Sequence, residues 1–185
     1  SVKLTEVIDE ANLRHELDSI QRLRATDEEV KYLETLKNNG QRLFGEDYLS
    51  FLRNIQLPGY KLSKEDGQFK LEFDGPWAKA IYWETMALSV INELYYRNIT
   101  SNSKDGDRLE TALYVGSRRL DEKIRGINQN PNIRFSEFGT RRRFSKNWQD
   151  YVVSELKEKT PAQMVGTSNV HLAMKHGLKP IGTMA

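Results

Sequence analysis

The sequence predicts an α-helical N-terminal region with one β-hairpin, followed by a region in which strands and helices alternate. Over residues 1–56, apolar side chains recur at three- to four-residue steps, as on the buried face of amphipathic helices. Asp66-Gly67 separates two stretches of alternating polarity, which indicates a hairpin. From residue 133 onward, short apolar strands, glycine-containing loops and helices follow one another. This order is typical of an α/β barrel or a doubly wound sheet.

Three helices are expected in the first 56 residues. The second begins at Thr26, which can cap it while Glu29 completes a capping box, and it ends at Asn39-Gly40. The third covers residues 46–54 and directs four side chains towards a core: Tyr48, Leu49, Phe51 and Leu52. We interpret these apolar faces as scaffold packing rather than as a partner groove.

The segment over residues 75–100 is apolar on nearly all sides, and such a helix is usually central. A polar loop over residues 101–107 follows and is the best candidate boundary by composition. The remaining expected elements are a helix over 109–127, a strand over 133–137, a helix over 145–159, a strand over 163–165, a helix ending at His176 before Gly177, and a strand-like step from Pro180.

The composition of the chain argues against several classes of protein. The chain has 185 residues, with 28 Lys and Arg against 26 Asp and Glu, and this balance does not suit a generic polyanion binder. It has no cysteine, which excludes thiolate metal sites and fits a reducing, cytoplasmic compartment. No apolar run is long enough to span a membrane. The first residue is not Met and the last residues, IGTMA, stop in an apolar stretch, so we expect both ends to be cut.

Ligands of such folds bind at the carboxyl ends of the strands, where three loops are expected: residues 138–143, 166–169 and 182–185. Each loop has a glycine, which lets the backbone approach a ligand, and a hydroxyl that can donate to an anion. The helix expected after Ser168 adds free N–H groups that favour phosphate or carboxylate.

The first of these loops is cationic: from Arg134 to Lys146, five cations accompany one carboxylate, Glu137. The arginine fork matches a carboxylate or phosphate, and the ring of Phe138 suits an aromatic anion such as a pyridine carboxylate. Adjacent arginines cannot all face one site, so we expect Arg142 or Arg143 to pair with a structural carboxylate. RNA binding through this loop is the alternative, which the near-neutral charge of the chain disfavours.

The histidines do not form a metal site. His171 and His176 lie five residues apart, on different faces of their helix, and we expect no metal ligand and no nucleophilic triad.

Several segments of the sequence, taken together, resemble one protein family. These are residues 136–145, 165–170 and 180–185, with Gly75-Pro76-Trp77 upstream, and they closely resemble nicotinate phosphoribosyltransferases. The resemblance implies an α+β N-terminal domain, residues 1–129, packed on the start of an irregular α/β barrel, residues 130–185. This is the type II phosphoribosyltransferase fold.

The resemblance also implies an activity. Nicotinate displaces pyrophosphate from phosphoribosyl pyrophosphate to give nicotinate mononucleotide, a step of NAD salvage that is coupled to ATP hydrolysis. The family works as a cytoplasmic homodimer with sites at the subunit interface, without nucleic acid or membrane. Mg²⁺ and ATP are expected as cofactors of the complete enzyme. We expect this segment alone to bind neither of them. A nicotinamide-using relative and an RNA-binding module remain the alternatives.

Four residues match the family's substrate site. Phe138 is expected to stack on the pyridine ring, Arg141 to lie nearest the nicotinate or phosphoribosyl anions, and Thr183 to line the nicotinate site. Ser168 stands where nicotinamide-using relatives carry an Asp, which would repel a carboxylate. Its neutrality favours nicotinate as the substrate.

Two family features are missing from the sequence. The N-terminal Asp-x-Tyr-Lys motif is absent, and the phosphorylated histidine is expected just after Ala185, where the sequence stops. No catalytic residue is therefore assigned within the chain. We expect these residues to be part of an enzyme and inactive alone.

Overall fold

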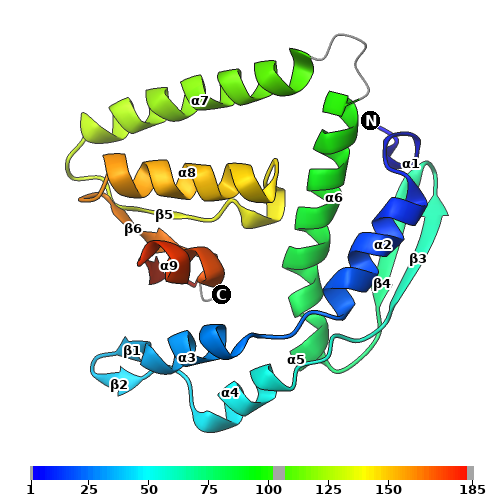
Figure 1. The fold of residues 1–185 in the computed structure, drawn as a ribbon, viewed down its shortest axis with the longest axis horizontal. Coiled ribbons are helices and arrows are strands. Elements are labelled where there is room, and N and C mark those ends of the chain that lie inside the picture. The colour runs from blue at the N-terminus through cyan, green and yellow to red at the C-terminus, as the bar shows by residue number, and fades with distance from the viewer. Residues whose placement is uncertain (1, 102–106, 183–185) are drawn as a thin grey trace. The chain divides into compact units, whose positions relative to one another are not determined.

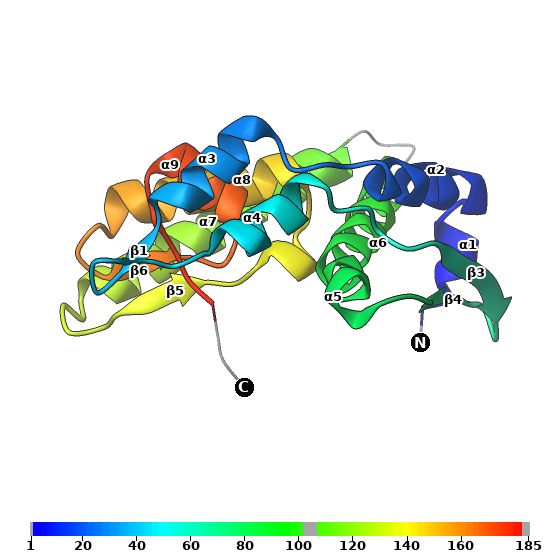
Figure 2. The same ribbon diagram turned by 90° about the horizontal axis from the view of Figure 1, so that it is seen from below.

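The computed structural model describes residues 2–101 and 107–182 of the chain (Figures 1 and 2). It divides into two compact units, Ser1–Ala87 and Leu88–Ala185, which are treated separately below. The candidate boundary at residues 101–107 lies largely outside the described residues. The division at residue 129 stays a prediction.

The first unit consists of helices and two hairpins. Its elements are α1 (Leu4–Val7), α2 (Glu10–Gln21), α3 (Asp27–Thr35), β1 (Lys37–Asn38), β2 (Gln41–Arg42), α4 (Glu46–Arg53), β3 (Tyr60–Glu65), β4 (Gln68–Phe73), α5 (Trp77–Ala80) and the start of α6 (Tyr82–Ser101). The capping box of α3 is confirmed: the Glu29 N–H donates to Thr26 Oγ1 at 3.2 Å, and the Thr26 N–H donates to Glu29 Oε2 at 2.8 Å.

Both hairpins of this unit turn on residues with positive φ. The expected β3–β4 hairpin is confirmed, with Asp66 at φ 49° and Gly67 at φ 76°. The β1–β2 hairpin was not expected, because Asn39-Gly40 was interpreted only as a helix end. Asn39 and Gly40 have φ values of 51° and 81°, which suit a tight hairpin turn. Its strands are so short and exposed that they leave no alternating pattern.

Apolar side chains form the core of the first unit, with Trp83 fully buried among them. The Trp83 ring stacks on Phe73 with 4.9 Å between centroids, and its Nε1–H donates to the Pro58 carbonyl at 2.9 Å. The expected inward position of Tyr48 is wrong, since its side chain is 38% exposed. On α4 it is Leu49 and Leu52 that face the core, so Tyr48 lies to one side, where its hydroxyl is hydrogen bonded to that of Tyr82.

The apolar segment after residue 76 is interrupted at Ile81, which separates α5 from α6. On α6, Trp83, Ala87 and Leu94 are buried on one face and Ser89 on another, while Leu88 remains exposed. The three buried apolar residues lie four and seven residues apart, which places them on one face of the helix. The segment is therefore not buried on all sides, since Leu88 on α6 remains exposed.

The second unit contains the parallel sheet. After α6 come α7 (Asp107–Asn128), β5 (Phe135–Glu137), the 3₁₀ turn η1 (Thr140–Arg142), α8 (Lys146–Lys159), β6 (Met164–Thr167), α9 (Val170–His176) and β7 (Lys179–Pro180). The strands are parallel in the order β5-β6-β7. Within the described residues these three strands do not close into a barrel.

Helices α7, α8 and α9 pack with this sheet around one apolar cluster (Figure 1). The cluster contains Leu120, Ile124, Val153, Leu156, Met164 and Leu172. Gly177 ends α9 in the left-handed conformation, at φ 59°, as its position after His176 predicted. None of the helices in residues 2–101 and 107–182 is both long and apolar enough to cross a membrane.

Candidate functional site

The parallel pairing of β5 and β6 brings two of the three expected loops together. Glu137 is paired with Thr167 at the ends of these strands, and the Ser168 N–H donates to the Glu137 carbonyl at 2.9 Å. The third loop follows β7 and begins beside them, since the Ile181 N–H donates to the Thr167 carbonyl at 2.9 Å. Thr183, the predicted nicotinate-site residue of that loop, lies outside the described residues.

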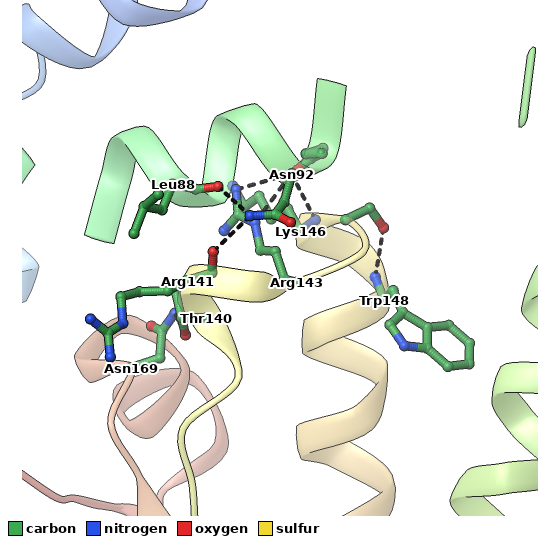
Figure 3. Close-up of polar contacts among 10 residues, drawn as sticks. Leu88, Asn92, Thr140, Arg141, Arg143, Lys146, Trp148 and Asn169 are labelled. Atoms are coloured by element: carbon green, nitrogen blue, oxygen red, sulfur yellow. Dashed lines mark hydrogen bonds and ion pairs between the residues drawn. The ribbon is translucent and has the colours of Figure 1, made fainter. Parts of the chain in front are cut away.

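Polar contacts hold the arginine loop, residues 138–143, and the start of α8 to α6 (Figure 3). Arg143 forms an ion pair with Glu93 at 3.0 Å, and the same carboxylate accepts the Lys146 N–H at 3.1 Å. Asn92 Nδ2 donates to the Arg141 carbonyl at 3.2 Å. One of the arginines is thus paired with a structural carboxylate, as expected, and it is Arg143.

Arg141 extends differently from Arg143. Figure 3 shows its side chain on the side of the loop where Thr140 and Asn169 lie, away from the side chain of Arg143. Arg141 is exposed, and Phe138 on the same loop is 47% exposed, whereas Ser168 on the neighbouring loop is half-buried. A cation and an aromatic ring are therefore accessible on one loop, next to a loop with a neutral hydroxyl. Their contact with a ligand stays a prediction.

Asn169 joins the two loops through its side chain. Its Nδ2 donates to Thr140 Oγ1 at 3.1 Å, while its Oδ1 accepts the Leu172 N–H at 3.0 Å and caps α9. One of the helix N–H groups that the sequence suggested for an anion is therefore already satisfied by the chain itself.

Two glycines and a threonine of these loops have a different role from the one expected. A Cβ on Gly166 would lie 2.0 Å from the Lys179 carbonyl oxygen, so this glycine permits β6 and β7 to pair closely. A Cβ on Gly139 would lie 2.7 Å from Glu137 Oε1. The Thr167 hydroxyl is buried and donates to Glu137 Oε2 at 2.7 Å. These groups support the loops and are not presented to an anion.

The sequence did not single out Glu137 and Gln149 as site residues. Both side chains are buried, with exposures of 8% and 5%. Glu137 could have been suspected, because it is the single carboxylate of a cationic stretch and shares a strand face with Phe135. Gln149 lies on α8, and no pattern in the sequence distinguishes it from a surface residue.

Asp150 on α8 binds two side chains at the end of α9, Lys175 and His176. It accepts hydrogen bonds from Lys175 and, at 2.7 Å, from His176 Nε2. Lys175 first, and then His176, hold the pKa of the Asp150 carboxyl below its ordinary value. His176 thus anchors a helix in this structure. In the described part of the chain, no cluster of three His, Asp or Glu residues could hold a metal ion.

Two models of known protein families match this chain. The model of the nicotinate phosphoribosyltransferase (NAPRTase) family matches residues 133–185, which include all three loops. The model of the NAPRTase N-terminal domain matches residues 3–92. The chain belongs to the nicotinate phosphoribosyltransferase family. The resemblance that the arginine loop suggested is confirmed.

Solved structures agree with this family. Nicotinate phosphoribosyltransferase from Porphyromonas gingivalis is 29% identical with a TM-score of 0.76, over 98% of this chain and 43% of that one. The enzyme from Vibrio cholerae is 29% identical with a TM-score of 0.74, over 98% and 41%. A putative nicotinate phosphoribosyltransferase from Saccharomyces cerevisiae is 25% identical with a TM-score of 0.71, over 100% and 47%. The chain spans less than half the length of each.

Proposed function

We propose that this chain forms part of the substrate site of a nicotinate phosphoribosyltransferase. One observation carries the proposal. The arginine loop lies beside the loop that contains Ser168, residues 166–169, which we call the Ser168 loop, at the carboxyl ends of β5 and β6. Arg143 forms an ion pair with Glu93, and Arg141 and Phe138 are exposed on the same loop. This arrangement suits a planar anion, which needs a ring surface and a cation together.

In the proposed reaction, the ring nitrogen of nicotinate forms a bond to C1 of the phosphoribosyl group. The bond from C1 to pyrophosphate breaks, and pyrophosphate leaves with the electron pair. Phe138 stacks on the pyridine ring and Arg141 binds a carboxylate or phosphate. Thr183 lines the nicotinate site. Their contribution is to position the substrates and to stabilise charge.

Ser168 determines the preference for nicotinate in this proposal. Its side chain is neutral and half-buried next to the arginine loop. A carboxylate at this position would accept a hydrogen bond from an amide but would repel the nicotinate carboxylate. Nicotinamide should therefore bind less well than nicotinate.

The remainder of the proposal concerns a complete enzyme. It comprises a closed irregular α/β barrel, a cytoplasmic homodimer with sites at the subunit interface, Mg²⁺, and ATP hydrolysis coupled to nicotinate mononucleotide formation in NAD salvage. A histidine following the third loop would carry the phosphoryl group. The 185-residue chain alone contributes binding groups without turnover.

The test uses saturation-transfer NMR on the 185-residue chain with nicotinate or nicotinamide. Nicotinate should receive the stronger transfer, and Arg141→Ala should weaken its binding about tenfold, as expected for a lost charge-assisted contact. Arg119→Ala is the control, because Arg119 is an exposed arginine on α7. Incubation with nicotinate, phosphoribosyl pyrophosphate and Mg-ATP should give no nicotinate mononucleotide by mass spectrometry.

Other outcomes would point elsewhere. Equal transfer to nicotinamide would favour the nicotinamide-using relative. Salt-sensitive RNA binding, lost in Arg141→Ala and unaffected by nicotinate, would favour the RNA-binding module. Product formation by the chain alone would overturn the expected inactivity.

A further inference from the structure

We infer that Glu137 is a positioning residue whose buried carboxylate holds the arginine loop and the Ser168 loop in register. The inference rests on the proposed function for its consequence in nicotinate binding. The positioning role itself follows from contacts within the second unit and can be tested without a ligand.

Glu137 contacts both loops with three of its atoms. Its Oε1 accepts the Gly139 N–H at the start of the arginine loop. Its Oε2 accepts the Thr167 hydroxyl at 2.7 Å, and its carbonyl accepts the Ser168 N–H at 2.9 Å. Glu137 thus binds Gly139 at the start of the arginine loop. It also binds Thr167, the last residue of β6, and Ser168, which follows it.

The environment of this carboxylate is unusual for a charged group. It is only 8% exposed, and within residues 2–101 and 107–182 no Lys or Arg forms an ion pair with it. A buried charge without an ionic partner requires strong hydrogen-bond donors. Here the donors belong to Gly139 and Thr167, so the burial of the charge depends on both loops being in place.

The space around Gly139 makes the arrangement specific. A Cβ on this residue would lie 2.7 Å from Glu137 Oε1 and 3.1 Å from Gln149 Oε1. Gln149 is buried on α8 and packs under the same turn. Gly139 therefore lies close to both a carboxylate and an amide, and a larger residue at this position would have to displace one of them.

The Glu137 contacts also affect the position of the predicted substrate-binding residues Phe138, Arg141 and Ser168. Phe138 lies between Glu137 and Gly139, and Arg141 follows within the same short loop. Ser168 directly follows Thr167, the other partner of the carboxylate. Fixing Gly139 and Thr167 on one carboxylate therefore fixes how far the aromatic ring and the arginine lie from the neutral hydroxyl. This separation would decide whether a planar anion fits between the loops.

The decisive experiment is amide hydrogen exchange by NMR on Glu137→Gln without any ligand. Glutamine keeps the shape of the side chain but presents an NH₂ group to one of the two donors. The Gly139 and Ser168 amides should exchange at least about tenfold faster, which corresponds to about 1.4 kcal/mol of local opening free energy. Amides of α2 in the first unit should not change. Glu158→Gln, at an exposed position on α8, is the matched control.

A second variant tests the same role in case Glu137→Gln does not fold. Thr167→Val removes one donor and leaves the carboxylate in place, so it should accelerate Gly139 and Ser168 exchange in the same direction. Unchanged exchange in folded Glu137→Gln, or acceleration spread evenly over the whole chain, would overturn the positioning role.

Binding measurements separate this inference from the proposed function. In Glu137→Gln, nicotinate affinity should fall about tenfold more than nicotinamide affinity, since only the acid depends on Arg141 and Ser168 together. A partly unfolded variant would lose both equally. Faster local exchange with no nicotinate binding by the unaltered chain would contradict the proposed function and leave the role of Glu137 intact.

Discussion

The two units differ in where they bury polar groups. In the described residues, every buried polar or charged side chain belongs to the second unit: Ser89, Glu137, Gln149, Thr160, Gln163 and Thr167. The first unit keeps its ion pairs at the surface, as between Arg14 and Glu10 or Arg53 and Glu34. Apolar packing therefore holds the first unit, whereas directed hydrogen bonds shape the loops of the second. Buried polar groups of this kind mark the region where the geometry of a site has to be fixed.

The largest effect is expected from Trp83→Ala in the first unit. Trp83 is fully buried and stacks on Phe73, so its removal should lower the unfolding free energy by about 3–5 kcal/mol. Trp77→Ala is the control, because Trp77 is 77% exposed and its loss should change stability by about 0.5 kcal/mol or less. Urea unfolding followed by circular dichroism measures both. Similar losses in the two variants would contradict an apolar core centred on Trp83.

Gly166→Ala tests the close pairing of strands in the second unit. The added Cβ would meet the Lys179 carbonyl oxygen at 2.0 Å, so β6 and β7 would have to separate. We expect a loss of about 2–3 kcal/mol, as for an overpacked interior. On α7, Gly126→Ala has no heavy atom within 4 Å of its Cβ and should instead stabilise by about 0.5–1 kcal/mol. Equal behaviour of the two variants in thermal unfolding would show that the sheet edge can relax freely.

A smaller effect is expected from Glu93→Gln, which weakens the attachment of the arginine loop. The substitution removes the ion pair with Arg143 and weakens the bond from the Lys146 N–H. Because the pair is partly exposed, the loss should be about 1 kcal/mol. Glu122→Gln, an exposed position on α7, serves as the control. If the two variants have the same urea midpoint, the contact with Glu93 does not stabilise the loop.

The smallest effect is expected from Asp150→Asn, and it should depend on pH. Because the folded chain holds the Asp150 pKa below its ordinary value, the unfolded chain binds this proton more readily. The stabilisation is therefore present at neutral pH and is lost as the pH falls below about 4. The variant should be about 0.5 kcal/mol less stable at pH 7, and this difference should shrink as the pH falls below about 4. A difference that grows on acidification would contradict this sign.

The sequence predicted the elements of the fold better than their environments. The capping box at Thr26 and Glu29, the hairpin at Asp66-Gly67 and the stop at Gly177 were predictable because each depends on local backbone chemistry. The β1–β2 hairpin was missed because its strands are too short for any periodicity. The exposure of one side of α6 was missed because apolar composition does not reveal which side finds a partner.

Prediction of the candidate site was limited in a similar way. The loops, the pairing of an arginine with a carboxylate and the family resemblance were visible in the residue order. The partnership of Glu137 with Gly139 and Thr167 was not, because it depends on the register of two parallel strands that are separated by α8. A hydroxyl in a Gly-Thr loop looks the same in a sequence whether it binds a ligand or supports a neighbour.

Thr167 also connects the motions of the three strand ends. Its carbonyl accepts the Ile181 N–H, and its hydroxyl oxygen accepts the Asn169 N–H at 3.1 Å while donating to Glu137. A fluctuation that exposes any one of these groups to water must disturb the others, since all depend on one residue at the middle strand. The ends of β5, β6 and β7 should therefore open and close as one cooperative unit, and a ligand that binds at one of them would reduce the motion of all three.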